Sequence, residues 1–174
     1  MRWRRLVAFV IDWCCMLGWI AVVAAVGIPL YLAGAIQLTG ALAQNLVGLT
    51  VVVPIVLAAA WCESRSRAAT PGKLALGLSV AHGDAQTRRS VSFPRALLRN
   101  TLKLGLPWII AHVAVFALVD TAASAVTPAW AFWLLGAAYV LPLLWVASLL
   151  LPGARTIYDR LSSTEVTGSR LASG

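Results

Sequence analysis

Four long runs of apolar residues alternate with polar segments along this chain. The runs cover residues 5–26, 42–62, 104–126 and 128–151, and each is close to the ~20 residues that a helix needs to cross a bilayer. One longer polar segment, residues 63–103, separates the second run from the third. The pattern predicts an all-α membrane protein, a bundle of four transmembrane helices joined by two short turns and one long loop.

The composition supports the same class of protein. Hydrophobic residues make up 60% of the 174 residues and charged residues 11%, whereas soluble domains average about 45–50% and 25%. The polar segment of about forty residues is marginal for a separate soluble domain. We therefore expect a single membrane domain over residues 1–166, followed by a short polar tail at residues 167–174.

The distribution of basic residues predicts the orientation of the bundle. Three of the 14 lysines and arginines lie before or at the start of the first run, eight lie between the second and third runs, and three follow the fourth. The two short connections, near residues 37–41 and 120–128, contain none. Because cytoplasmic segments of membrane proteins are enriched in lysine and arginine, we expect both termini and the loop at residues 63–103 in the cytoplasm.

The net charge of +8 bears on the partners of the chain. Basic residues near a membrane surface each gain about 1 kcal/mol from anionic lipids. We expect anionic lipids of the cytoplasmic face as partners and no nucleic acid, because membrane orientation already accounts for the charge.

The polar loop contains a basic stripe. Arg95, Arg99 and Lys103 recur every four residues, after a serine and a proline that are suited to the start of a helix. The stripe predicts an amphipathic helix at the membrane interface before the third span, with these three cations in contact with lipid headgroups.

Two other patterns in the loop are informative. Residues 76–86 predict a short extended pair around a turn at His82, Gly83 and Asp84. The Gly-Lys pair at residues 72–73 lacks the first glycine and the final serine or threonine of a phosphate-binding loop, so a nucleotide site is not expected.

The first span carries a carboxylate, Asp12, seven residues after Arg5. Seven residues are two helical turns, so the two side chains lie on one face, roughly 10 Å apart along the axis. A charge at the bilayer centre costs about 2.5–3.5 kcal/mol on insertion scales. Asp12 is therefore the leading candidate for an ion- or proton-binding group, and His112 and Asp120 are secondary candidates.

The three cysteines form neither a CxxC pair nor a cluster with histidine, so we expect no metal site and no cofactor.

The segment that follows the fourth run is RTIYDRLSSTEV, which contains Asp159. Together with RRLVAFVID, which provides Arg5 and Asp12, it resembles the RDD family of bacterial membrane proteins. That family is named for an arginine and an aspartate in the first helix and a second aspartate near the end. The segments ATPGKLALGLSV and SFPRALLRN resemble the middle of the family. One departure is Ser163-Thr164, where the family usually has Gly-Thr after the last aspartate.

The resemblance implies a small multi-pass protein of the bacterial inner membrane. Transport, including cation/proton exchange, has been proposed for some members, and an enzyme is not implied. An enzyme would need acids, bases or metal ligands converging at one depth, and a pairing of Asp12 with His112 is the nearest approach to that. We therefore expect no enzymatic activity.

Two functions remain open. In a transporter or ion-handling protein, Asp12 binds the ion or proton and Arg5 and Asp159 form the cytoplasmic gate. Four short helices hardly enclose a pathway, so this function requires a homodimer or larger complex. In a non-catalytic scaffold or accessory subunit, the same residues are structural pairs. An Arg5–Asp159 salt bridge is then expected at the inner interface, with Asp12 bound by hydroxyls, waters or another helix.

Overall fold

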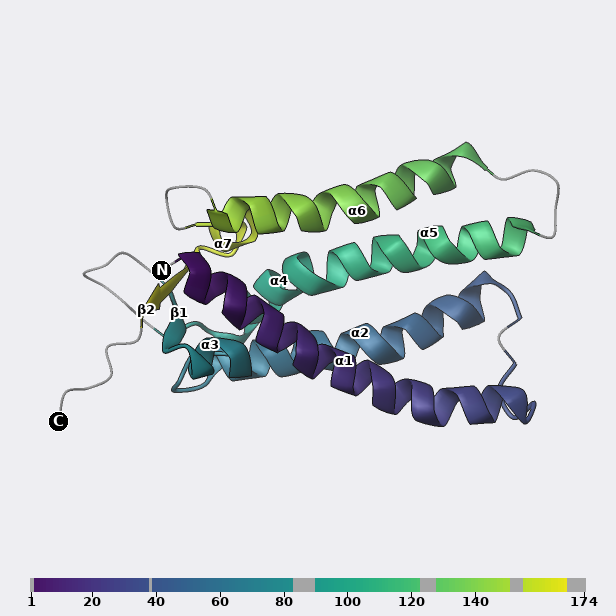
Figure 1. The fold of residues 1–174 in the computed structure, drawn as a ribbon, viewed down its shortest axis with the longest axis horizontal. Coiled ribbons are helices and arrows are strands. Elements are labelled where there is room, and N and C mark those ends of the chain that lie inside the picture. Colours follow the sequence, from purple (N-terminus) through teal and green to yellow (C-terminus); the bar gives the residue numbers. More distant parts are fainter. Residues whose placement is uncertain (1, 38, 83–89, 123–127, 151–154, 169–174) are drawn as a thin grey trace.

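The computed structural model describes residues 2–37, 39–82, 90–122, 128–150 and 155–168, and four long helices dominate it (Figure 1). They are α1 (Arg2–Leu32), α2 (Ala41–Ser64), α5 (Leu106–Ala122) and α6 (Ala129–Leu150). The described ranges contain four helical segments that are long and apolar enough to cross a membrane. The prediction of four helices able to span a membrane is confirmed.

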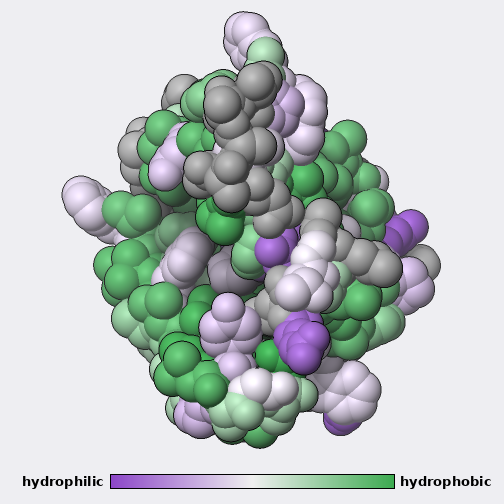
Figure 2. Space-filling view, turned by 90° about the vertical axis from the view of Figure 1, so that its right-hand side faces the viewer, coloured by the Kyte–Doolittle hydropathy of each residue, from purple (hydrophilic) through white to green (hydrophobic). Residues whose placement is uncertain are grey.

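Large apolar side chains on the outside of the bundle fit a lipid environment. On α6, Trp133 is 80% exposed and Tyr139 and Leu143 are 68% and 66% exposed. Seen from the end opposite the start of α1, apolar residues cover most of the visible surface (Figure 2). A helix that is hydrophobic all round belongs in a core or in a bilayer, and only 11–22% of the most apolar window of each span is buried inside the protein.

The third span begins earlier than the hydropathy predicts. The helix α4 (Phe93–Asn100) continues through η1 (Thr101–Gly105), a π-helical turn, directly into α5. The Leu106 N–H bonds to the Thr101 carbonyl, one residue further back than in an α-helix, just before Pro107 removes a backbone donor. The basic stripe therefore lies on the first turns of a membrane helix, and a separate interfacial helix is not observed.

Short elements gather at the end of the bundle where α1 begins (Figure 1). They are α3 (Pro71–Ala75), β1 (Leu78–His82), α7 (Ile157–Leu161) and β2 (Thr164–Gly168). The strands pair antiparallel, with Leu78 opposite Gly168 and His82 opposite Thr164. A small apolar cluster joins this sheet to the helices, and its buried members are Ala8, Ala60, Leu78, Val80, Val91, Ala96 and Val166.

The sheet corrects the prediction of a hairpin around His82. The first extended segment exists as β1, but its partner is β2, from the C-terminal part of the chain. The predicted turn at residues 83–84 lies outside the described residues. Alternation of polar and apolar residues predicts a strand, but it does not say which strand pairs with it.

Ser163 stands at the turn between α7 and β2, where this chain departs from the Gly-Thr that is usual in the family. Its φ is 53°, in the left-handed region that favours glycine. We expect Ser163→Gly to raise the free energy of unfolding by up to about 1 kcal/mol, because the left-handed backbone costs side-chain-bearing residues about 1–2 kcal/mol. Thermal unfolding of the detergent-solubilised protein measures the effect.

The adjacent serine provides a matched control for this substitution. Ser162 has a φ of −93°, and its hydroxyl donates to the Tyr158 carbonyl at 2.7 Å. Ser162→Gly should therefore lower the melting temperature. Equal effects of the two substitutions would contradict a conformational origin.

Candidate functional site

A buried carboxylate at the end of α2 binds three side chains at once. Glu63 is 0% exposed and accepts hydrogen bonds from Lys73, from Arg99 Nη1 at 2.6 Å and from Asn100 Nδ2 at 2.8 Å. Lys73 comes from α3, and the other two are consecutive residues at the end of α4. Glu63 therefore ties three elements together at one point.

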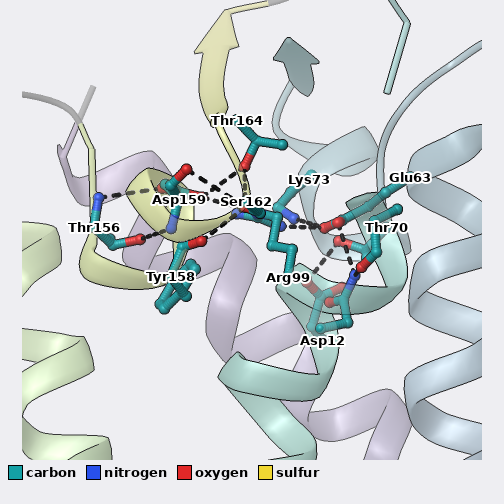
Figure 3. A network of polar contacts seen from close by, with 12 residues as sticks. Asp12, Glu63, Thr70, Lys73, Arg99, Thr156, Tyr158, Asp159, Ser162 and Thr164 are labelled. Atoms are coloured by element: carbon teal, nitrogen blue, oxygen red, sulfur yellow. Dashed lines mark hydrogen bonds and ion pairs between the residues drawn. The ribbon is translucent and has the colours of Figure 1, made fainter. Parts of the chain in front are cut away.

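Arg99 extends this arrangement to the C-terminal segment (Figure 3). Its guanidinium lies between two carboxylates, with Nη1 on Glu63 and Nε donating to Asp159 Oδ1 at 2.8 Å. Arg99 and Asp159 are each 1% exposed. Buried charges persist when they are paired and hydrogen-bonded, and here two cations and two anions alternate. We call Lys73, Glu63, Arg99, Asn100 and Asp159 the buried network.

Asp159 also holds its own helix in place. Thr156 is the N-cap of α7, and Thr156 and Asp159 form a capping box, each side chain bonded to the other's backbone N–H at 3.3 Å. Burial raises the pKa of the Asp159 carboxyl, but the Arg99 guanidinium and the bonds from Arg99 and Thr156 outweigh it and hold that pKa below its ordinary value. Burial and the nearby Arg99 charge lower the pKa of the Lys73 ammonium.

These contacts correct the prediction that the basic stripe contacts lipid. Arg99 is engaged by two carboxylates, and Lys103 is 9% exposed. Arg95 is exposed, and its headgroup contact stays a prediction. The four-residue spacing places the three cations on one helix face, but distant parts of the chain cover two of them.

Asp12 is bound by a different part of the loop. It is 8% exposed, and its two oxygens accept hydrogen bonds from Thr70 Oγ1 at 2.7 Å and from the Gly72 N–H at 2.8 Å. Both donors stand at the start of α3, where helix N–H groups lack intrahelical partners. Asp12 therefore caps α3 from the neighbouring helix.

The capping contact depends on a close approach between α3 and α1. A Cβ atom at Gly72 would lie 2.1 Å from the Ala8 carbonyl oxygen and 2.9 Å from Asp12 Oδ1. Only glycine fits between these groups. The Gly-Lys pair that superficially suggests a nucleotide loop is thus explained by packing against α1 and by the Lys73–Glu63 ion pair.

Arg5 has a different partner from the one expected. Its guanidinium donates to the Val166 carbonyl in β2, and Asp159 is bound by Arg99 instead. The expected Arg5–Asp159 salt bridge is therefore replaced by the Arg99–Asp159 pair. Arg5 still joins the start of α1 to the C-terminal segment, through a backbone acceptor.

A cavity of about 400 Å³ adjoins Asp12. We call it the Asp12 cavity, and its polar wall is formed by Asp12, Thr70, Asn100 and Lys103, with Cys15 and Cys62 beside them. Within the described ranges, Lys103 makes no hydrogen bond or ion pair, and its ammonium lies 5.5 Å from the centre of the Phe9 ring. Asn100 Oδ1 is buried and also lacks a partner among the described residues.

His112, one of the two secondary candidates, lies away from this cavity. His112 Nε2 is 2.9 Å from the carbonyl oxygen of Gln44, in the first turn of α2, whereas Asp12 adjoins the last turn through the Asp12 cavity. A Cβ atom at Gly48 would lie 2.3 Å from His112 Nε2, so the histidine occupies a packing notch on α2. A proton relay from Asp12 to His112 is not formed. The side chain of Asp120 lies outside the described residues.

The sequence model of the RDD family matches residues 1–163, which covers every contact described above except those of the last strand. The chain belongs to the RDD family. No curated protein and no solved structure gives a significant match.

The three residues behind the RDD resemblance turn out to make three separate contacts. Arg5 binds β2, Asp12 caps α3, and Asp159 binds Arg99. All three are at the same end of the bundle, and each joins a membrane helix to the polar segments there. Together the three contacts connect α1, α3, α4, α7 and β2 at this end.

Sequence reasoning missed four members of this site, namely Glu63, Thr70, Lys73 and Asn100. Glu63 carried a usable signal, because it is an acidic residue at the end of an apolar run that precedes a basic segment. Among the described residues, no group of three or more His, Cys, Asp or Glu side chains could hold a metal ion.

Proposed function

We propose that this RDD membrane protein handles ions in the bacterial inner membrane, exchanging a monovalent cation for a proton at Asp12. The observation that carries the proposal is the setting of that carboxylate. Asp12 accepts two hydrogen bonds from the protein, has no ion pair among the described residues, and adjoins a cavity of about 400 Å³. Intramembrane carboxylates with this access mark ion and proton pathways.

The geometry leaves part of the Asp12 carboxylate available to a ligand. Thr70 and Gly72 each bind one oxygen and fix its orientation. A carboxylate has about four lone-pair sites, so two protein donors leave acceptor capacity for a cation or proton. Lys103 lines the same cavity, and its positive charge would favour release of a bound cation.

The test compares proton-coupled sodium, lithium and potassium flux in proteoliposomes containing the protein or Asp12→Asn. We expect the substitution to lower flux at least tenfold. Asparagine is isosteric, and the Thr70 hydroxyl can accept from the new amide instead of donating, so the fold should survive. Glu165→Gln, at an exposed ion pair, is the matched control and should leave flux unchanged. Flux that persists in Asp12→Asn would exclude the role given to Asp12.

The proposal extends to assembly, orientation and chemistry. Four helices in one chain leave little room for an enclosed pathway, so we propose a homodimer, which native mass spectrometry from lipid nanodiscs can test. Both termini face the cytoplasm in this proposal, as the basic residues indicate. The activity requires no cofactor and no catalytic residue, and we propose that the protein is not an enzyme.

A second function, a membrane scaffold or accessory subunit, is supported by the buried network. Two cations and two anions are fully enclosed and join α2, α3, α4 and α7, which suits a rigid platform better than a moving gate. Absence of flux in the unmodified protein, combined with a lowered melting temperature in Asp12→Asn, would favour this function over ion handling.

A further inference from the structure

The Asp12 cavity has two opposite charges in its wall that do not pair with each other. Asp12 and Lys103 both line the cavity, and they are 8% and 9% exposed. Within the part of the chain that the structure describes, neither side chain makes an ion pair. Both also line a smaller cavity of about 20 Å³, which has room for about one water molecule. The two charges are therefore near each other but not in contact.

Unpaired charges in the wall of one cavity indicate a ligand that pairs with both. Buried charges are normally paired, because an isolated charge is costly away from water. The two donors to Asp12 are a hydroxyl and a backbone N–H, which are neutral. The Lys103 ammonium can only donate, and it lies 5.5 Å from the centre of the Phe9 ring. A complementary ligand carries a cationic donor for Asp12 and an anionic acceptor for Lys103.

The remainder of the wall determines the size and polarity of that ligand. Met16 and Trp19 of α1, Ile55 of α2 and Leu104 of η1 contribute apolar side chains. Ligand sites typically combine an apolar wall with a few polar groups in a volume of about 300–1,000 Å³, and this cavity has about 400 Å³. At roughly 30 Å³ per water-sized group, it accommodates roughly 13 such groups. A small molecule with an aliphatic part fits this space.

We infer that the Asp12 cavity binds a small apolar zwitterion, namely an α-amino acid with an aliphatic side chain such as leucine. The ligand's ammonium group donates to the Asp12 carboxylate, and its carboxylate accepts from the Lys103 ammonium. Its aliphatic side chain contacts the apolar wall. The inference rests on the cation-binding role proposed for Asp12, because the ligand's ammonium group and an alkali cation would occupy the same carboxylate.

The test measures the binding of radiolabelled leucine to the full chain in lipid nanodiscs by scintillation proximity. We expect saturable binding, with an affinity that falls at least tenfold in Asp12→Asn and in Lys103→Met. The matched control is Arg95→Met, which removes an exposed cation from the helix that precedes Lys103 and should leave the affinity unchanged. Unchanged leucine affinity in Lys103→Met would overturn the inference.

Two analogues of leucine, each lacking one of its charges, separate a binding role from a structural one. In the unmodified protein, 3-methylbutylamine and 4-methylpentanoate should each compete at least tenfold more weakly than leucine. Competition by the amine equal to that of leucine would reveal a site for cations alone, and equal competition by the carboxylate would reveal a site for anions alone. Either result overturns the inference. If a charge variant does not fold, this comparison decides the question without it.

Cation flux in the same preparation distinguishes this inference from the function on which it rests. Absence of leucine binding, together with alkali-cation flux that depends on Asp12, would overturn the inference and leave the proposed function intact. Saturable leucine binding that depends on Asp12 and Lys103, without alkali-cation flux, would support the inference and contradict cation exchange.

Discussion

Glu63→Gln should lower the free energy of unfolding by about 3–5 kcal/mol, because removing one partner of a buried ion pair leaves an uncompensated charge. Glutamine has nearly the same shape, and its amide oxygen can still accept from Asn100. The loss is therefore one of charge, which leaves Lys73 and Arg99 with Asp159 as the remaining anion of the buried network. Thermal unfolding of the purified protein, followed by circular dichroism, measures the effect.

The matched control for Glu63→Gln is Glu165→Gln. Glu165 pairs with Arg155 at 3.3 Å, and both side chains are about one-third exposed. An exposed pair of this kind is worth less than about 1 kcal/mol. A second variant, Glu63→Gln/Lys73→Met, removes the stranded ammonium and should recover part of the lost stability. Equal melting temperatures for Glu63→Gln and Glu165→Gln would contradict the role given to the buried network.

Gly72→Ala should be strongly destabilising although it adds a single methyl group. The new Cβ would lie 2.1 Å from the Ala8 carbonyl oxygen. This oxygen belongs to the backbone of α1, which cannot move aside as the end of a flexible side chain can. Relief requires α3 to move away from α1, which breaks the bonds from Thr70 and Gly72 to Asp12. We expect a loss of about 3 kcal/mol, at the upper end of overpacking costs, measured by thermal unfolding.

Gly27→Ala is the control for this prediction. Gly27 lies in α1, and a Cβ atom there meets nothing within 4 Å. Alanine is favoured over glycine in helices by up to about 1 kcal/mol, so this variant should be as stable as the unmodified protein or more stable. Equal melting temperatures for Gly72→Ala and Gly27→Ala would show that α3 does not pack against α1 as described.

The membrane spans were predictable because their cause is local. A helix that crosses a bilayer must be apolar along its own length. The hydropathy of the segment's own residues therefore predicts the span without information from the remainder of the chain. The start of the third span was not predictable in the same way. Arg99 and Lys103 interrupt the apolar pattern, so the sequence placed residues 93–103 at the interface rather than in a membrane helix.

The contacts of the candidate site depend on residues far apart in the sequence. Arg99 is 36 residues from Glu63 and 60 from Asp159, and Gly72 is 60 residues from Asp12. The sequence identified Arg5 and Asp12 from their positions in the first apolar run and Asp159 from the RDD resemblance. It placed Asp12 deeper than the other two and could not assign the partners of any of the three. The expected Arg5–Asp159 pair rested on similar depth and opposite charge, a criterion that Arg99 meets as well.

The pairing of Arg99 with Asp159 also has a consequence for biosynthesis. The ribosome makes Glu63, Lys73 and Arg99 long before Asp159 and β2, so a nascent chain that has inserted all four long helices still holds two cations against one anion. The C-terminal segment neutralises this excess and pairs β2 with β1. Chains that stop short of Asp159 should therefore insert but not mature, and would remain recognisable to membrane proteases.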